Sequence, residues 1–200
     1  MLSKISNGVL LSIFAYLLGS IPFGFIIPKI KGIDIRTIGS KATSATNVSR
    51  ALGWRWGLLS GGLDIFKGAI PSYLALNYLT NGWQIIGVSL LPVFGHIFPV
   101  WLKFKGGRGA ATFFGATAVL IGPKFFSLFF LIWILILALS KIMSLANLLF
   151  PWILSILLFI FFPFPYFIYG ILAASLITFA LRENIKRLRQ GVEPRVSFRW

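Results

Sequence analysis

Long apolar runs alternate with short polar segments along the whole of this chain. The apolar runs cover residues 9–27, 63–79, 83–102, 110–122, 124–139, 148–162 and 166–181. A bilayer core about 30 Å thick is crossed by roughly 20 apolar residues in a helix, and the chain has room for several such helices. The pattern therefore predicts an all-α, polytopic membrane protein with about seven transmembrane helices.

Composition supports this prediction. Of the 200 residues, 58% are hydrophobic and 12% are charged, and the mean hydropathy is +0.89. An ordinary soluble domain does not have this composition. We therefore expect a single integral-membrane domain over residues 1–200, in contact with membrane lipid, and the sequence shows no convincing internal repeat.

The net charge of +15 would indicate a nucleic-acid partner in a soluble protein. Here Lys and Arg lie between the apolar runs, where the positive-inside rule explains them, so we expect no nucleic acid. Seven spans place the two ends on opposite sides. With the N-terminus outside, residues 29–55, 103–108, Lys141 and the C-terminal tail face the cytoplasm, and only Lys4 and Lys124 lie outside. The sequence therefore predicts short cytoplasmic loops that carry the polar chemistry.

Few residue types are available for catalysis. The chain has no Cys, one His and four acidic residues. These counts exclude disulfides and a Cys acyl-enzyme, and they argue against a His/carboxylate metal cluster. We expect neither a metal ion nor a cofactor.

The first polar segment, residues 28–50, follows a helix end that is broken by Pro22 and its neighbouring glycines. Thr43 or Ser44 could cap a short helix that runs to about residue 59 and ends at the glycine pair 61–62. Four side chains in this segment are candidates for phosphate binding near a helix N-terminus: Ser40, Thr46, Asn47 and Arg50. The alternative is an interfacial amphipathic helix, anchored by Trp54 and Trp56, whose arginines contact lipid headgroups.

The second polar segment combines glycines with basic side chains. Four of its residues, Lys105, Gly106, Gly107 and Arg108, could bind an anion through backbone N–H groups and positive charge. A basic loop that only sets topology is the alternative. His96 lies seven residues before Lys103, or about 10 Å inside the loop. It is either a functional group in the membrane or a histidine satisfied by a neighbouring hydroxyl.

Three further places carry polar residues. Asp64 and Lys67 form an i,i+3 pair that we expect at the membrane boundary, in a structural role. A short return over residues 141–147 contains Ser144. The third polar segment, residues 182–195, contains Arg182, Asn184 and Lys186. We therefore expect these loops to share a small, multiply charged anion as ligand. Five basic residues could together offset two phosphates: Arg50, Lys105, Arg108, Arg182 and Lys186.

Three stretches of this chain resemble motifs of the bacterial membrane glycerol-3-phosphate acyltransferases that use acyl-phosphate donors. The first runs from Gly39 to Arg50, with Thr43-Ser44 where the family has Pro-Gly. The second runs from Gly95 to Gly109, with Arg108 where the family has Lys. The third runs from Arg182 to Glu193. The order and spacing of the three match over nearly the whole chain.

The resemblance implies acyl transfer from acyl-phosphate to the 1-hydroxyl of glycerol 3-phosphate, giving lysophosphatidic acid and phosphate in the bacterial inner membrane. The cytoplasmic loops would then form the active site. Asn184, His96 and Ser144 are the candidates for catalysis, with Asn184 in a positioning role and a substrate phosphate or His96 as the base. The ten other candidates bind substrate: Ser40, Thr46, Asn47, Arg50, Lys105, Gly106, Gly107, Arg108, Arg182 and Lys186. An anion transporter or a purely structural membrane subunit is the alternative class; a transporter usually has repeated halves, which this chain lacks.

Overall fold

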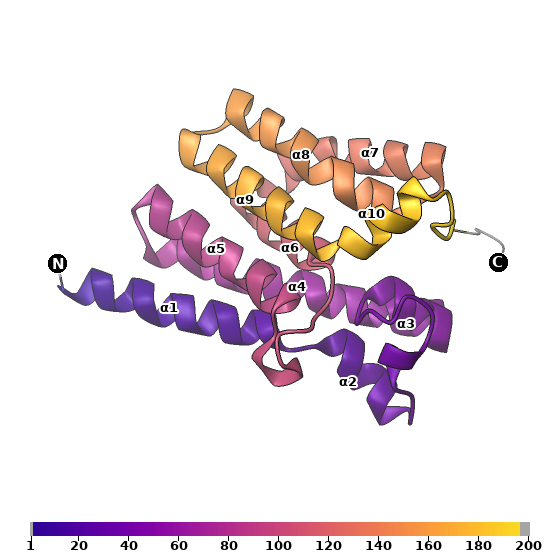
Figure 1. Cartoon of the computed structure of the whole chain (residues 1–200). Helices are drawn as coiled ribbons and strands as arrows, with labels where there is room; N and C mark the ends of the chain where they lie inside the picture. Colours follow the sequence, from indigo (N-terminus) through magenta and orange to yellow (C-terminus); the bar gives the residue numbers. More distant parts are fainter. Residues whose placement is uncertain (1, 197–200) are drawn as a thin grey trace. The chain divides into compact units, whose positions relative to one another are not determined.

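The computed structural model describes residues 2–196, with side chains from residue 7 onward. The chain forms two compact units, residues 1–120 and residues 121–200, called here the N-terminal and the C-terminal unit. The described part is helical and contains no strand (Figure 1). The prediction of one domain over residues 1–200 stays a prediction.

The N-terminal unit is arranged around one long helix, α4. Its helices are α1 (Leu2–Ser20), α2 (Phe23–Ile30), α3 (Ala45–Leu52), α4 (Trp54–Tyr78), α5 (Gly82–Ile97) and α6 (Ala110–Leu120), with short 3-10 turns η1 (Ile35–Thr37) and η2 (Val100–Leu102). Helix α4 packs against α1, α2, α3, α5 and α6. Because these helices cover one face of α4, that face can carry polar side chains that are kept away from lipid.

Small residues let the helices of the N-terminal unit approach closely. A side chain on Gly68 of α4 would overlap the backbone of Thr112, and a side chain on Gly115 of α6 would overlap the backbone of Ile65. Close contact of this kind is how helices commonly associate inside membranes, where lipid provides no hydrophobic driving force between them. The α4–α6 crossing is thus a contact of backbone against backbone.

The C-terminal unit contains four helices: α7 (Gly122–Ser140), α8 (Met143–Phe161), α9 (Phe164–Ala180) and α10 (Arg182–Arg189). Helix α8 packs against both α7 and α9. Side-chain hydrogen bonds join the same helices. Trp133 of α7 donates to Asn147 of α8 at 2.9 Å, and Trp152 of α8 donates to Thr178 of α9 at 3.0 Å. Helix α10 is polar and turns away from α9 by 66°.

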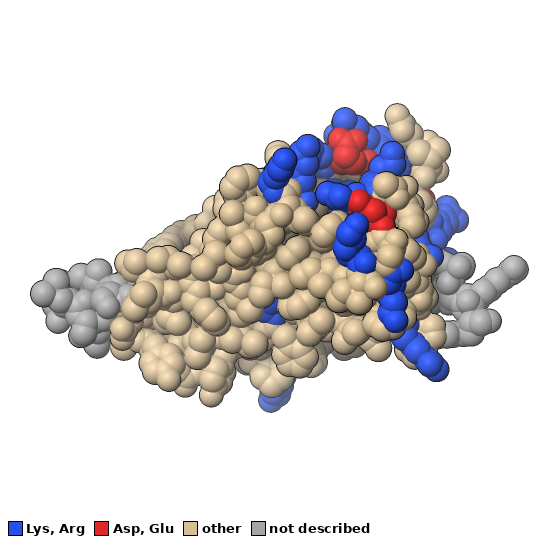
Figure 2. All heavy atoms as spheres, turned by 90° about the horizontal axis from the view of Figure 1, so that it is seen from below, with Lys and Arg blue, Asp and Glu red and all other residues tan. Residues whose placement is uncertain are grey.

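The predicted fold class, an all-helical polytopic membrane protein, is confirmed. Within the described residues, four helical stretches are long and apolar enough to cross a membrane, namely Asn7–Ile30, Gly82–Leu102, Ala110–Ser140 and Met143–Phe161, and the bent pair α9 and α10 would add a fifth. A helix also occupies each of the seven predicted runs. Helix α4 is long enough but less apolar, because it includes Asp64 and Lys67. Most of the surface seen in Figure 2 carries no charged residue, as a lipid-embedded protein requires.

Three helix boundaries differ from those expected. The short helix after Ser44 ends at Leu52, because Gly53 adopts a φ of +92°, and α4 begins directly afterwards at Trp54 and runs through the glycine pair at 61–62. Helix α5 ends at Ile97 rather than continuing past Pro99. A proline disfavours helical geometry at the residue before it, which here is Phe98. Helix α8 starts at Met143, so Ser144 lies in its first turn and not in a loop.

Candidate functional site

Asn47 organises the first polar segment from inside. Its side-chain Nδ2 donates to the carbonyl oxygens of Ile35, Ile38 and Ala42 at 3.3, 2.9 and 3.1 Å, and its Oδ1 accepts from the backbone N–H of Ser40 at 3.1 Å. Asn47 is fully buried. The sequence predicted Asn47 as a substrate ligand, whereas in this structure its amide closes the loop over residues 35–42.

Arg50 is the exposed member of this segment. Ser44 caps α3, as expected, by accepting from the N–H of Asn47. One turn later, the aliphatic part of Arg50 lies beside Gly39, and the Asn47 side chain lies against the same glycine. Thr46 and Ser40 are half-buried, and Arg50 is exposed. The loop held by Asn47 thus presents the Arg50 guanidinium to the surface.

Aromatic rings and basic side chains meet beside this loop. The Lys31 ammonium lies 4.7 Å from the Trp56 ring, and the Arg36 guanidinium lies 4.9 Å from the Phe25 ring. Arg36 also pairs with Asp34 at 2.6 Å, and the hydrogen bonds from Arg36 lower the pKa of Asp34 to about 2. This arrangement suits a membrane interface, as the amphipathic interpretation expects, and phosphate binding by this segment stays a prediction.

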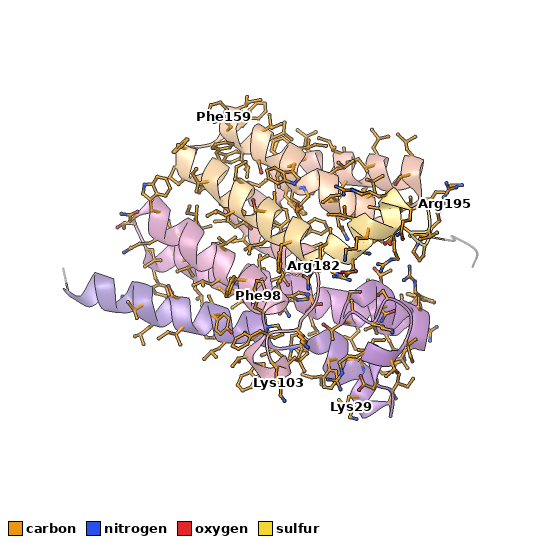
Figure 3. The ribbon with its side chains drawn as sticks, viewed as in Figure 1. Lys29, Phe98, Lys103, Phe159, Arg182 and Arg195 are labelled. Atoms are coloured by element: carbon orange, nitrogen blue, oxygen red, sulfur yellow. The ribbon has the colours of Figure 1, made fainter. Side chains whose placement is uncertain are left out.

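The basic loop, residues 103–109, folds back onto the end of α5. The N–H of Gly106 donates to Ile97 at 3.1 Å, and the N–H of Gly107 donates to His96 at 3.0 Å. These two N–H groups therefore satisfy carbonyls at the helix C-terminus, although the sequence suggested them as anion donors. Lys105 is exposed and Arg108 half-buried; the loop begins at Lys103, labelled in Figure 3.

Glycine is required in the basic loop by close approach. A side chain at Gly107 would overlap the imidazole of His96 on its Nε2 side, and one at Gly106 would overlap the carbonyl of His96 and the ring of Pro99. The expectation that His96 lies about 10 Å from the loop is therefore wrong. The chain turns back after Pro99, which brings the loop glycines into contact with His96.

His96 belongs to a buried polar cluster made by α4, α5 and α6. Thr112 Oγ1 lies 3.2 Å from His96 Nδ1, and Asp64 Oδ1 lies 3.5 Å from the same nitrogen. Lys67 Nζ lies 2.8 Å from Asp64 Oδ1 and donates to the carbonyl of Ile21 at 2.7 Å. All four side chains are at most 8% exposed. Asp64 and Lys67 are thus a buried pair in the middle of α4, and their place at the membrane boundary stays a prediction.

The cluster resembles a catalytic triad in composition but not in geometry. In a triad the carboxylate and the hydroxyl contact opposite nitrogens of the imidazole. Here Asp64 and Thr112 both face Nδ1, and Gly107 covers the Nε2 side. Thr112 is therefore not placed as a nucleophile that His96 could activate.

In the C-terminal unit the predicted residues gather around Glu193, which the sequence placed in a motif without giving it a role. Asn184 Nδ2 and Ser144 Oγ donate to Glu193 Oε1 at 2.6 and 2.7 Å, and Arg187 Nε donates to Oε2 at 2.7 Å. Burial raises the pKa of Glu193, but the hydrogen bonds from Asn184, Ser144 and Arg187 and the charge of Arg187 outweigh it, so the pKa lies below its usual value. The tail is also tied to the α7–α8 turn, where Val196 donates to the Lys141 carbonyl at 2.7 Å.

Two of the three predicted catalytic residues, Asn184 and Ser144, thus bind the same carboxylate oxygen. The Oδ1 atom of Asn184 is buried and has no hydrogen-bond partner within the described residues. It is therefore available to accept a hydrogen bond from the hydroxyl of a bound molecule. One clue in the sequence could have identified Glu193: an acid among so many basic residues is a candidate for a specific partner.

Arg182 and Lys186 lie on the exposed side of α10. The Arg182 guanidinium stacks 4.6 Å from the Phe179 ring, and Lys186 pairs with Glu183 at 3.2 Å. Among the described residues, no group of three His, Cys, Asp or Glu side chains is placed to hold a metal ion. The site residues of this unit therefore comprise a buried amide–carboxylate group and exposed basic side chains.

Comparison with known proteins identifies the class and then the family. Two solved structures share the fold over 95% of this chain, with TM-scores of 0.91 and 0.88 and 39% and 38% identity, and cover 96% and 95% of their own chains. Both are crystal structures of PlsY (YgiH), an integral membrane glycerol 3-phosphate acyltransferase, one in the glycerol 3-phosphate form and one in the lysophosphatidic acid form. The class is therefore that of integral-membrane acyltransferases.

The family follows from sequence. A family model described as glycerol-3-phosphate acyltransferase matches residues 9–191. The glycerol-3-phosphate acyltransferase of Aquifex aeolicus is 40% identical, with 94% of this chain and 99% of that protein covered, and that of Thermus thermophilus is 37% identical, with 94% of each covered. This chain belongs to the glycerol-3-phosphate acyltransferase family.

Proposed function

We propose that this protein transfers a fatty acyl group from an acyl-phosphate to the 1-hydroxyl of glycerol 3-phosphate, giving lysophosphatidic acid and inorganic phosphate. The acceptor and the product are those for which the two related crystal structures are described. In this reaction the acceptor oxygen forms an ester bond with the acyl carbon. The bond between that carbon and the phosphate oxygen breaks, and phosphate leaves with the electron pair.

The observation that carries direct transfer is the geometry around His96. The hydroxyl of Thr112 and the carboxylate of Asp64 share one imidazole nitrogen, and the other nitrogen faces Gly107. The chain also lacks Cys. An acyl-phosphate is an activated anhydride that reacts without an enzyme nucleophile. The protein then needs only to position two anions and to stabilise the leaving phosphate.

Basic side chains supply the charge for this task. Arg50 in the first segment, Lys105 and Arg108 in the basic loop, and Arg182 and Lys186 on α10 are proposed to contact substrate phosphates. Arg50→Ala or Arg108→Ala should lower kcat/KM by roughly ten- to a hundredfold, because a charged hydrogen bond contributes about 1.5–3 kcal/mol. Arg55→Ala is the matched control: Arg55 is also exposed and stacks over Trp54 at 5.6 Å. Near wild-type kinetics in both test variants would assign these arginines to topology alone.

The proton of the attacking hydroxyl is proposed to pass to a substrate phosphate, whose second pKa near 6 suits a base. His96 is the alternative base, but its Nε2 side is covered by Gly107. Asn184 carries an amide, which cannot act as a base at neutral pH, and it is assigned to positioning the acceptor. A folded His96→Ala protein that keeps substantial turnover would support this choice, and its complete inactivity would overturn it.

The donor is tested by offering each candidate in turn. Purified protein in detergent, with a chelator present, should form labelled lysophosphatidic acid from glycerol 3-phosphate and long-chain acyl-phosphate. Acyl-CoA and acyl-carrier protein should give little product, because the short basic loops suit a phosphate leaving group and offer nothing specific to a thiolate. Comparable rates with acyl-CoA would refute the donor, and loss of activity in chelator would refute a metal-free reaction.

The proposed location is the bacterial inner membrane, with the N-terminus outside and the active site in the cytoplasm. The absence of Cys allows single cysteines to be placed at Asn7 and Gln190 and labelled from either side of the membrane. Opposite accessibility is expected. Labelling of both positions from the same side would contradict an odd number of spans.

A further inference from the structure

The buried polar cluster of the N-terminal unit has a feature that acyl transfer does not by itself require. Lys67 and Asp64 are 1% exposed, in the middle of α4. Taking two charges out of water is expensive even when they pair. An apolar pair would fill the same space at lower cost, so the charges call for an explanation.

The cluster contacts two other parts of the N-terminal unit, namely the break between α1 and α2 and the end of α5. On one side Lys67 donates to the carbonyl of Ile21, which also accepts from the Phe23 N–H at the break between α1 and α2. On the other side Asp64 and Thr112 both face His96 Nδ1. A carboxylate at this nitrogen favours the tautomer with a proton on Nδ1, which leaves Nε2 without one.

The imidazole in turn contacts the basic loop. The Nε2 side of the His96 ring lies against Gly107. The backbone carbonyl of His96 also accepts from the Gly107 N–H at 3.0 Å. The ring thus lies directly against Gly107 of the basic loop. Rotation of the ring would push Gly107 away and would move Lys105 and Arg108, which are attached to the same short loop.

We propose that Asp64, Lys67 and Thr112 are positioning residues: they fix the orientation of the His96 imidazole, and through it they hold the basic loop in its anion-binding conformation. This inference rests on the proposed function, because it takes the loop to bind a substrate phosphate. None of the three residues touches substrate. Their effect is on the placement of Lys105 and Arg108.

The test uses charge-neutral variants of the full-length protein. Asp64→Leu combined with Lys67→Met removes both charges together, and such replacements of buried ion pairs are often tolerated. Thr112→Val removes the hydroxyl at constant shape, and Thr112→Ser keeps it. Ser72→Ala is the control, because Ser72 is buried on the same helix and its hydroxyl donates only to its own helix, at Gly68.

The double variant should raise KM for one of the two phosphate-bearing substrates by about tenfold or more, with a smaller change in kcat, because small displacements of binding groups have large effects. Thr112→Val should raise the same KM to a lesser degree, while Thr112→Ser and Ser72→Ala should not. The chain has one histidine, so nitrogen NMR of histidine-labelled protein reports His96 alone. The wild type should show the Nδ1-protonated tautomer, and the double variant should lose that preference.

Lys105→Ala separates this inference from the proposed function. If Lys105→Ala leaves both KM values unchanged, the loop does not bind the anion, and both the proposed loop role and the positioning role fail. If Lys105→Ala raises a KM while the folded double variant and Thr112→Val keep wild-type KM values and the wild-type tautomer, the positioning role alone is wrong. Should the double variant not fold, the comparison of Thr112→Val with Thr112→Ser decides, and equal KM values in the two would overturn the proposal.

Discussion

Asp64 and Glu193 are both buried carboxylates, yet they are stabilised in different ways. Their side chains are 2% and 7% exposed. Asp64 lies within α4 and is approached by Lys67 and His96 at one oxygen. Glu193 follows α10 and accepts from three donors that use both of its oxygens.

The two carboxylates differ in the basic residue that would lose its partner if the carboxylate were removed. Lys67 is 1% exposed, so without Asp64 its ammonium would be a buried charge that keeps the Ile21 carbonyl as a hydrogen-bond partner and the Phe23 ring as a neighbour. Arg187 is 30% exposed, so without Glu193 it could be solvated. We therefore expect the loss of Asp64 to reduce stability more than the loss of Glu193, which also binds Asn184 and Ser144.

The largest effect is expected from Asp64→Ala. It strands Lys67 and should reduce the free energy of unfolding by about 3–5 kcal/mol, measured by thermal or denaturant unfolding in detergent. The variant Asp64→Leu with Lys67→Met is the control and should recover most of the loss. A single variant as stable as the wild type would contradict the view that the buried charges depend on each other.

Gly107→Ala should have the next largest effect, since it disturbs the first cluster without changing its charge. The added methyl group overlaps the His96 imidazole, and overpacking of this kind costs about 1–3 kcal/mol. We expect a raised KM with a lower unfolding temperature. Gly87→Ala on α5 is the matched control, because a side chain there meets no other atom. Equal kinetics in the two variants would mean that the loop does not depend on its contact with His96.

A pH dependence distinguishes Glu193. Its pKa in the folded protein lies below the usual 4.5, so its cluster contributes stability above that pH, and this contribution is lost as the pH falls through the folded pKa. Glu193→Gln should therefore lower stability at neutral pH and flatten its decline below about pH 4.5. Glu183→Gln, which changes an exposed glutamate on α10, is the control. Parallel pH curves for wild type and Glu193→Gln would contradict the assignment.

The smallest effect is expected from Ser144→Ala, which removes one of the three donors to Glu193. The loss should be about 0.5–1.5 kcal/mol, with kcat lowered only modestly if Ser144 supports Glu193. Steady-state kinetics beside unfolding curves would show this. A collapse of kcat at unchanged stability would instead return Ser144 to the catalytic role that the sequence predicted.

Much of the helical architecture could be predicted from sequence, because apolar runs, glycines and prolines act locally. The break at Pro22 and the cap at Ser44 are examples. The environment of Lys67 could not, since its carbonyl partner lies 46 residues away. An i,i+3 pair has the same spacing whether it is buried or exposed.

The candidate site was predictable in its residue types and less so in the tasks of its residues. Asn47 and Gly107 were identified by their motifs, but the motif does not say whether a polar group faces a ligand or the protein. In the structure both face the protein. Backbone carbonyls, which carry no sequence information, are their partners, and this is why sequence reasoning assigned them to substrate.

The position of Glu193 also sets an order of events during synthesis. The ribosome makes α8 with Ser144, then α10 with Asn184 and Arg187, and only afterwards the glutamate that joins them. The polar end of the C-terminal unit therefore cannot mature until Glu193 has been translated. Asp64 and Lys67, by contrast, are made three residues apart and can pair as soon as α4 forms. The N-terminal unit can thus neutralise its buried charges early, while the nascent C-terminal unit exposes Arg187 without its carboxylate.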